Sequence, residues 1–204
     1  MSRIAVDVVI LPDEAMTDKA IEANRELVEQ AGERIVLNKQ SCLPHISLAM
    51  GCIDETDIEA IEHVLAQIAE KTALGRLNVI GVQTSTNSVG ETVSVLEVEN
   101  KPELQQLHEQ VMGRLAGYLS PDVTADMLFH PDEVGRSTLL WIKNYRQKSS
   151  FENFLPHITA GYGELKDMSF PIEFTARELA LCHLGNHCTC RAVLASAKLK
   201  AGEG

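Results

Sequence analysis

The sequence predicts an α+β fold formed by internal duplication. Helical and strand-like stretches are mixed along the 204 residues, and hairpin signals favour antiparallel pairing over a doubly wound parallel sheet. The pentapeptides LPHIS at residues 43–47 and LPHIT at residues 155–159 are nearly identical, which indicates two copies of one structural element. No low-complexity linker separates the halves, so we expect one domain over residues 1–204 that is made of two lobes.

The chain opens with a strand and a helix. Residues 3–11, RIAVDVVIL, are strand-like. A polar helix is predicted from about Asp13 to a stop near Gly32, because aspartate is a good N-cap and glycine commonly ends a helix.

A second strand and helix follow. A loop leads into the strand that contains His45, and residues 54–73 then carry apolar side chains at helical spacing. Thr56 and Glu59 stand at capping-box spacing, which predicts the start of this helix.

The middle of the chain predicts a hairpin and a third helix. Strands at about 77–83 and 92–98 flank the turn-rich TSTNSVGE, with Gly90 near the bend. Leucine and valine recur at helical spacing after it, and Pro102 suits the first turn of that helix.

The last third contains the second motif strand and a closing hairpin. Residues 120–134 are loop-like, and residues 135–150 are a short helix or an irregular basic segment. After the motif, strand-like runs at 177–185 and 188–199 surround a Gly-Asn turn signal.

Composition limits the classes of partner and the compartment. The values of 45% hydrophobic and 23% charged residues are ordinary for a globular protein, and no apolar run is long enough to span a membrane. A net charge of −11 disfavours long duplex nucleic acid. The alternating N-terminus contains Asp7 and resembles no secretory signal, so we expect a cytoplasmic protein. Five cysteines without a CxxC pair favour reduced thiols.

The two repeated motifs indicate acid–base chemistry at phosphorus. Side chains two apart share one face of a strand, so His45 projects with Ser47, and His157 projects with Thr159. Imidazole populates both protonation states near neutrality, so one histidine can remove a proton while the other donates one. The hydroxyls can donate to phosphoryl oxygens, and the reaction requires no metal.

A third H-x-[ST] triplet shows that the pattern alone is weak. His187 to Thr189 match it, but they lack the Leu-Pro prefix and the apolar strand, and we predict a turn there. The shared prefix and setting are what make the other two copies specific.

PHISLAMG and PHITAGYG resemble the two signature motifs of the two-histidine (2H) phosphoesterases, which include 2'-5' RNA ligase-like proteins and cyclic nucleotide phosphodiesterases. The resemblance implies a bilobal pseudo-twofold fold, with antiparallel sheets lining a central cleft and helices packed outside. It also implies that His45 and His157 are the acid–base pair, and that Ser47 and Thr159 bind the phosphate. Many members carry an arginine shortly after the second motif, where this chain has Tyr162, a possible substrate contact.

We therefore expect a metal-independent phosphodiesterase, without a cofactor, that acts on a 2',3'-cyclic phosphate of a small nucleotide or RNA end. We expect a monomer without membrane contact. Lys39, shortly before the first motif, is a further candidate phosphate contact. Two alternatives keep the same site: 2'-5' RNA ligation, and a module that binds a phosphoester without turnover. The sequence does not assign which histidine is the base.

Other interpretations compete with catalysis. His45 and His157 could be buried strand histidines, and the two hydroxyls could pair across the sheet. A zinc site is a further alternative, because thiols and imidazoles cluster near the C-terminus, at Cys182, His183, His187, Cys188 and Cys190. Basic and aromatic residues interleave as on a nucleic-acid surface, although a solvated helix face with both aromatic side chains in the core is favoured (Trp141, Lys143, Tyr145, Arg146, Lys148). Packing roles are expected for His63 and His108, and a solvated loop position for His130.

Overall fold

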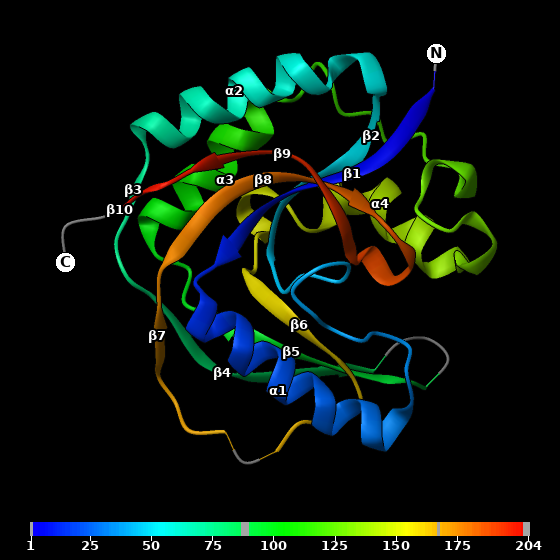
Figure 1. Cartoon of the computed structure of the whole chain (residues 1–204), viewed down its shortest axis with the longest axis vertical. Helices are drawn as coiled ribbons and strands as arrows, with labels where there is room; N and C mark the ends of the chain where they lie inside the picture. The colour runs from blue at the N-terminus through cyan, green and yellow to red at the C-terminus, as the bar shows by residue number, and fades with distance from the viewer. Residues whose placement is uncertain (1, 87–89, 167, 202–204) are drawn as a thin grey trace.

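The computed structural model describes residues 2–86, 90–166 and 168–201, and it contains a curled antiparallel sheet with helices packed around it (Figure 1). The strands of the described residues are β1 Arg3–Pro12, β2 Ile46–Asp54, β3 Ala73–Leu74, β4 Leu77–Thr86, β5 Thr92–Val98, β6 His157–Tyr162, β7 Ile172–Phe174, β8 Ala176–Leu184, β9 Cys190–Lys198 and β10 Lys200–Ala201. The α-helices are α1 Glu14–Ala31, α2 Ile58–Lys71, α3 Pro102–Arg114 and α4 Arg136–Lys148. Short 3-10 turns are η1 Glu55–Asp57, η2 Ala125–Met127, η3 Pro131–Glu133, η4 Phe151–Asn153 and η5 Asn186–Cys188.

The sheet confirms the predicted α+β class and its duplication. Its strand order is β7-β4-β5-β6-β2-β1-β8-β9, and every neighbouring pair is antiparallel. The two motif strands, β2 and β6, are the inner neighbours of this series, so each half contributes four strands. Helix α1 lies against β6, and α2 lies against β8 and β9 in the other half (Figure 1). The fold thereby brings together two segments more than a hundred residues apart.

Helix α1 begins and ends where the sequence predicts. The Asp13 side chain accepts a hydrogen bond from the Met16 N–H at 2.9 Å, which satisfies one of the free amides of the first turn. Gly32 ends the helix with a φ of 84°, a conformation that glycine adopts without steric cost.

The predicted capping box at Thr56 is wrong. Asp54 accepts hydrogen bonds from both the backbone N–H and the hydroxyl of Thr56, so the threonine side chain is a donor to a neighbour and caps nothing. The turn η1 comes first, and α2 starts at Ile58 without a side-chain cap. The Thr56 hydroxyl therefore donates to Asp54, two residues upstream, and does not accept from the first turn of the helix.

Helix α4 replaces the irregular alternative for residues 135–150. Tyr145 is buried, as the helix-face interpretation requires, whereas the Trp141 side chain is half exposed, so only one of the two aromatic residues anchors the helix in the core. The hairpin β4–β5 and the closing hairpin β8–β9 are confirmed. The turn predicted between these two strands includes residues 87–89, which lie outside the described residues, and Gly90 has a φ of 82°.

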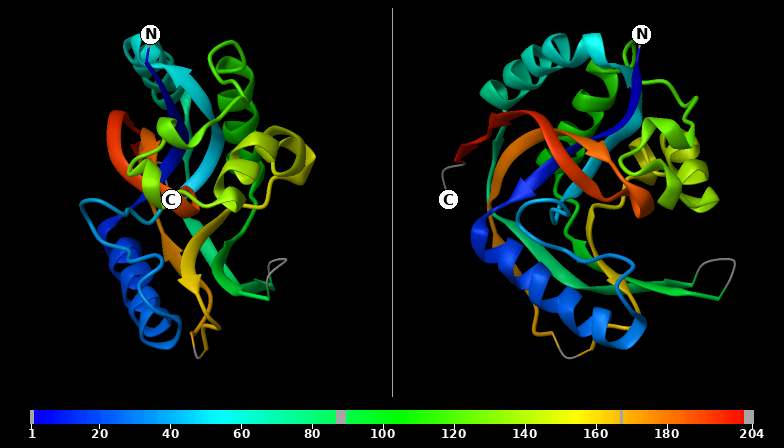
Figure 2. Two further views of the ribbon diagram at one scale, coloured as in Figure 1. Left: turned by 90° about the vertical axis from the view of Figure 1, so that its right-hand side faces the viewer. Right: turned by 45° about the vertical axis from the view of Figure 1, so that its right-hand side comes forward.

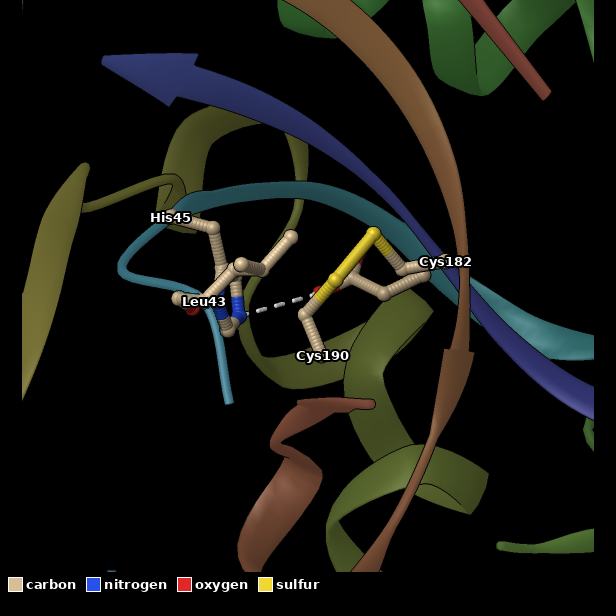
Figure 3. Close-up of a disulfide and its surroundings, with 5 residues drawn as sticks. Leu43, His45, Cys182 and Cys190 are labelled. Atoms are coloured by element: carbon tan, nitrogen blue, oxygen red, sulfur yellow. Dashed lines mark hydrogen bonds and ion pairs between the residues drawn. A yellow bond between two sulfur atoms is a disulfide. The ribbon is translucent and has the colours of Figure 1, made fainter. Parts of the chain in front are cut away.

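The prediction of reduced thiols is wrong for Cys182 and Cys190, which form a disulfide, whereas Cys42, Cys52 and Cys188 are free. Cys182 lies on β8 and Cys190 opens β9, and irregularities in the β8–β9 register bring their Cα atoms to 5.5 Å. Figure 3 shows the disulfide beside Leu43, whose N–H donates to the Cys190 carbonyl at 3.1 Å. The C-terminal hairpin therefore holds the segment that leads into the first motif. None of the described helices combines the length and apolar character that a membrane span requires.

His108 is a buried structural residue of α3. Its Nδ1–H donates to the Leu48 carbonyl at 2.9 Å, its Nε2 accepts from the Phe151 N–H at 2.8 Å, and its ring stacks on Phe154. This confirms the packing role expected for His108, whereas His63 on α2 is exposed. Burial lowers the His108 pKa because it disfavours the charged imidazolium, and the neutral ring satisfies both partners.

We expect His108→Leu to lower the free energy of unfolding by about 2–3 kcal/mol at pH 7.5, because two buried backbone groups lose their partners. The cost should shrink as the pH falls below about 6.5. There the unfolded chain protonates this histidine before the folded chain does, and wild type loses up to about 1.4 kcal/mol per pH unit. Urea unfolding of both proteins at pH 7.5 and 5.5 measures this difference; a pH-independent gap would contradict the assignment.

Candidate active site

The two motif strands meet at a single backbone pair. Ile46 of β2 is the antiparallel partner of Ile158 of β6, and both isoleucines are fully buried. The opposite chain directions therefore place His45 facing Thr159 and Ser47 facing His157. We call this arrangement the seam: the Ile46–Ile158 pair with the four polar side chains that flank it. Figure 2 shows β6 meeting β2 where the two halves join.

The seam puts the two imidazoles on one diagonal and the two hydroxyls on the other. Residues at the four polar positions are half-buried while their strand neighbours Ile46 and Ile158 are buried, so the polar side chains share one face. Facing Cβ atoms in such a pair are about 4.5–5.5 Å apart and diagonal ones about 7–8 Å. The four polar side chains are therefore gathered on one face around a single backbone pair.

The Leu-Pro-His prefix fixes the tautomer of each ring. Nδ1 of His45 lies 2.7 Å from the Leu43 carbonyl oxygen, and Nδ1 of His157 lies 2.7 Å from the Leu155 carbonyl oxygen. A carbonyl can only accept, so each Nδ1 carries the proton and each neutral ring leaves the Nε2 lone pair free. The two copies of the motif thus present the same reactive nitrogen.

The surroundings of both rings favour the neutral imidazole over the imidazolium. Burial lowers the pKa of His45 and of His157, because it disfavours the charged imidazolium. The charge on His157 lowers the His45 pKa further. Tyr145 of α4 supports the seam from behind by donating its hydroxyl to the Ser47 carbonyl at 3.4 Å.

A β-bulge turns Tyr162 toward the seam. The β5–β6 register skips Ala160, whose partner is missing between the pairs Val95–Thr159 and Ser94–Gly161. Gly161 consequently faces α1: a Cβ there would lie 2.9 Å from the Asn24 side chain, and its φ is 146°. Tyr162 then returns to the half-buried face that carries His157 and Thr159.

Tyr162 forms a hydrogen bond with a histidine from the other half of the molecule. Its hydroxyl lies 3.0 Å from Nδ1 of His187, which belongs to η5 between β8 and β9. Asn186 Nδ2 is only a donor and lies 3.3 Å from His187 Nε2, so in the neutral ring Nδ1 carries the proton and donates to Tyr162. The Tyr162 hydroxyl proton is then left for a further acceptor.

The cation beside Tyr162 is Arg34, which comes from the loop after α1 and not from the segment after the second motif, where many family members carry an arginine. Arg34, in the loop after α1, places its guanidinium 4.0 Å from the centre of the Tyr162 ring and pairs with Glu91. By contrast, Lys39 pairs with Asp18 and Glu14 of α1 and lines a pocket that contains none of the four polar seam side chains. A substrate contact by Lys39 stays a prediction.

Sequence reasoning missed three residues of this site. The sequence predicts a turn at His187, and the structure has one, but this turn reaches across to Tyr162. Arg34 has no local signal, since only the fold carries its loop to β6. Asp7 had a signal: it is the one charged side chain between apolar neighbours in IAVDVVIL. It is fully buried on β1, with a carboxylate oxygen 3.8 Å from His45 Nε2.

The C-terminal cysteine and histidine cluster does not form the zinc site considered from the sequence. Two of its thiols are joined as the disulfide, and His183 Nε2 contacts the Met127 carbonyl at 3.0 Å. Among the described residues, no group of three or more His, Cys, Asp or Glu side chains is arranged to hold a metal ion. His130 is the left-handed residue that precedes η3, and its ring lies edge-on against Phe129.

Comparison with known proteins agrees with this geometry. No curated protein matches the chain. The fold is similar to the crystal structure of TT0787 of Thermus thermophilus, with a TM-score of 0.59 and 15% identity, over 98% of this chain and 100% of that chain. At this identity the likeness concerns the fold alone. The family model of the 2'-5' RNA ligase superfamily matches residues 38–187, which include both motifs and His187. Since this match spans well over half of the sequence, the chain belongs to the 2'-5' RNA ligase superfamily of two-histidine phosphoesterases.

Proposed function

We propose that the protein is a phosphodiesterase that hydrolyses a 2',3'-cyclic phosphate, or a related phosphodiester at the end of a small nucleotide or RNA, by acid–base catalysis between His45 and His157. The observation that supports the proposal is the Ile46–Ile158 pair, beside which two histidines and two hydroxyl side chains share one face and each Nδ1 contacts a backbone carbonyl, so each Nε2 is the nitrogen that can exchange a proton. One imidazole, in its neutral form, takes a proton from the attacking water while the other, in its protonated form, gives a proton to the departing ribose oxygen.

The hydroxyls of Ser47 and Thr159 hold the non-bridging oxygens in this proposal. They face His157 and His45 across the seam, so each oxygen that carries charge in the transition state has a donor beside it. These four side chains supply proton transfer and charge stabilisation by themselves, so the chemistry needs neither a metal nor a cofactor.

Tyr162 and Arg34 are proposed to bind the part of the substrate next to the reacting phosphate. The Tyr162 ring already carries a stacked guanidinium on one side, and its hydroxyl has a proton to donate. An aromatic ring beside a cation suits a nucleotide, whose base stacks and whose phosphates attract positive charge.

The test is turnover with metals removed. We expect the protein, in excess EDTA, to convert 2',3'-cyclic nucleoside monophosphates into a single phosphomonoester isomer, identified by phosphorus NMR. Single-isomer product is expected because the two halves of the site are not identical around the substrate. Absence of turnover across all four bases, with binding retained, would point instead to a phosphoester-binding module.

Ligation is the second candidate, because the same two histidines can activate a 5'-hydroxyl in place of water as the group that attacks the cyclic phosphate, and the superfamily takes its name from ligation. The assay for it supplies a 2',3'-cyclic phosphate end and a free 5'-hydroxyl end at high concentration. A 2'-5' linked product that forms faster than the hydrolysis product would favour ligation.

A further inference from the structure

Helix α4 presents an exposed cationic face on an acidic protein. Residues 134–151 contain no carboxylate and four basic side chains: Arg136, Lys143, Arg146 and Lys148. They contribute +4 to a chain of net charge −11, so the rest of the chain carries −15. All four are exposed, and none of them forms an ion pair or a side-chain hydrogen bond with another residue that the structure describes.

Two large apolar side chains stand among these cations. Leu140 is 47% exposed and Trp141 is 50% exposed. Residues four and seven apart share one side of a helix, so Arg136, Leu140 and Lys143 form one ridge. Trp141 and Lys148, seven apart, form the ridge beside it. We call these five residues the α4 face. An exposed indole offers a flat surface on which a base can stack, and the cations beside it attract phosphates.

The buried side of the same helix reaches the seam. Helix α4 lies against β2 (Figure 1), and the Tyr145 hydroxyl donates to the Ser47 carbonyl at 3.4 Å. Near the start of the helix, the Thr138 hydroxyl donates to Asn186 Oδ1 of η5 at 2.7 Å. One helix therefore contacts the candidate active site with its inner side and presents the α4 face on its outer side.

The distance between the seam and the α4 face corresponds to a few nucleotides. A helix with its side chains is about 10–12 Å across, and phosphates along a stacked strand are about 3.4 Å apart, so about three to four nucleotides span this thickness. The 13 residues of α4 extend over about 20 Å, the length of about six nucleotides. Arg146 marks the route, because it lies over the ring of Phe151 in η4, directly before the segment that contains His157.

A single strand of RNA matches this face better than other anionic partners do. A duplex keeps its bases stacked on one another and offers none to Trp141, and the net charge of −11 repels a long polyanion. A helix that inserts into a membrane surface exposes its apolar side, whereas α4 buries Ile142 and Tyr145 against the protein. A 2',3'-cyclic phosphate requires a ribose, which makes the strand RNA.

We propose that the α4 face binds the single-stranded RNA that leads to the reacting 2',3'-cyclic phosphate, with one base stacked on Trp141 and phosphates beside Lys143 and Lys148. This inference rests on the proposed function. The strand makes these contacts equally before and during the reaction, so they lower KM for RNA ends and leave the turnover of a mononucleotide unchanged.

The first test measures binding without turnover. The probe is a 5'-fluorescein hexauridylate that ends in a 3'-phosphate, and its Kd is measured by fluorescence anisotropy at several salt concentrations. Trp141→Ala should weaken binding by about 5- to 150-fold, whereas Trp141→Phe should bind nearly as wild type does. Lys143→Gln combined with Lys148→Gln should reduce the slope of log K against log salt concentration by about 1.4, which is about 0.7 for each lost phosphate contact.

The matched control removes the same charge elsewhere. Lys19→Gln combined with Lys71→Gln, exposed positions on α1 and α2, should leave both the Kd and the salt slope unchanged. An equal loss of binding in the two lysine pairs would overturn the proposal, because the effect would then come from net charge alone. Equally tight binding of an RNA hairpin with a fully paired stem would also overturn it.

The second test compares substrates of two lengths. In wild type, kcat/KM should be about tenfold or more higher for a hexauridylate with a 2',3'-cyclic phosphate end than for uridine 2',3'-cyclic monophosphate. In Trp141→Ala and in the α4 lysine pair this ratio should approach one through a raised KM for the hexamer, while the mononucleotide is hydrolysed as by wild type. A ratio that is unchanged in these variants would overturn the proposal and leave hydrolysis intact.

Two further outcomes separate the remaining alternatives. If neither substrate is hydrolysed but the probe binds through Trp141 and the two lysines, the proposed function fails and the strand-binding face stands. If the lysines instead govern co-sedimentation with vesicles of phosphatidylserine and phosphatidylcholine, and the probe does not depend on them, the α4 face belongs to a membrane surface and the RNA proposal is overturned.

Discussion

Replacing either His45 or His157 with alanine is expected to lower kcat/KM for a 2',3'-cyclic nucleotide by about 10²–10⁴-fold, the range of a lost general acid or base. Both rings are held by backbone carbonyls of their own segment, so their removal leaves the Ile46–Ile158 pair and the fold in place. Steady-state kinetics in EDTA, with circular dichroism to check folding, measures the effect.

The double variant adds a sharper expectation. If the two imidazoles act on the same phosphorus atom, removing the second should cost much less than removing the first, because groups that work as a unit are not additive. His63→Ala, an exposed histidine on α2, is the matched control and should retain wild-type activity. Losses that multiply independently would argue against a shared site.

The second large effect is structural and concerns Asn24 of α1. Its Nδ2 donates to the carbonyls of Ile35 and Ala160, and its Oδ1 accepts from the Leu37 N–H, so one buried side chain satisfies three backbone groups. Asn24→Ala leaves all three without partners. We expect the free energy of unfolding to fall by about 3–5 kcal/mol, measured by urea unfolding.

Asn24 also connects stability to the site, because the Ala160 carbonyl belongs to the bulge that turns Tyr162 toward the seam. Any folded Asn24→Ala protein should therefore show a raised KM for the cyclic nucleotide as well. Asn144→Ala, on the exposed side of α4, removes a hydrogen bond within one helix and should change stability by less than about 0.5 kcal/mol. A similar loss in both variants would contradict the role given to Asn24.

Local chemistry made much of the fold predictable. Asp13 and Gly32 marked the ends of α1 because the capping interactions involve neighbours in the sequence. The two motif strands were predictable because the same pentapeptide occurs twice in an alternating apolar setting. Thr56 was misassigned because a nearer acceptor, Asp54, competed for its hydroxyl, and the residue pattern does not rank two such partners.

What escaped prediction depends on contacts between distant segments. Asp7 becomes a neighbour of His45 only through the β1–β2 register, and His187 reaches Tyr162 only through the β8–β9 turn. The Cys182–Cys190 disulfide depends on irregularities in the β8–β9 register, which the spacing of the two residues does not reveal. Helical and strand periodicity describes one element at a time, whereas these residues are joined by the order of strands in the sheet.

The hydrogen bond from each imidazole to the carbonyl two residues upstream has a consequence for protein engineering. The acceptor is a backbone carbonyl, so the Leu-Pro-His tripeptide orients the imidazole of its own histidine. The interaction does not depend on which side chain stands at the first position. Leu155 is 72% exposed whereas Leu43 is partly covered by the C-terminal hairpin, yet both rings adopt the same arrangement. A designer could therefore transplant X-Pro-His to the start of a strand in an unrelated scaffold and obtain a histidine of defined tautomer without building a supporting residue around it.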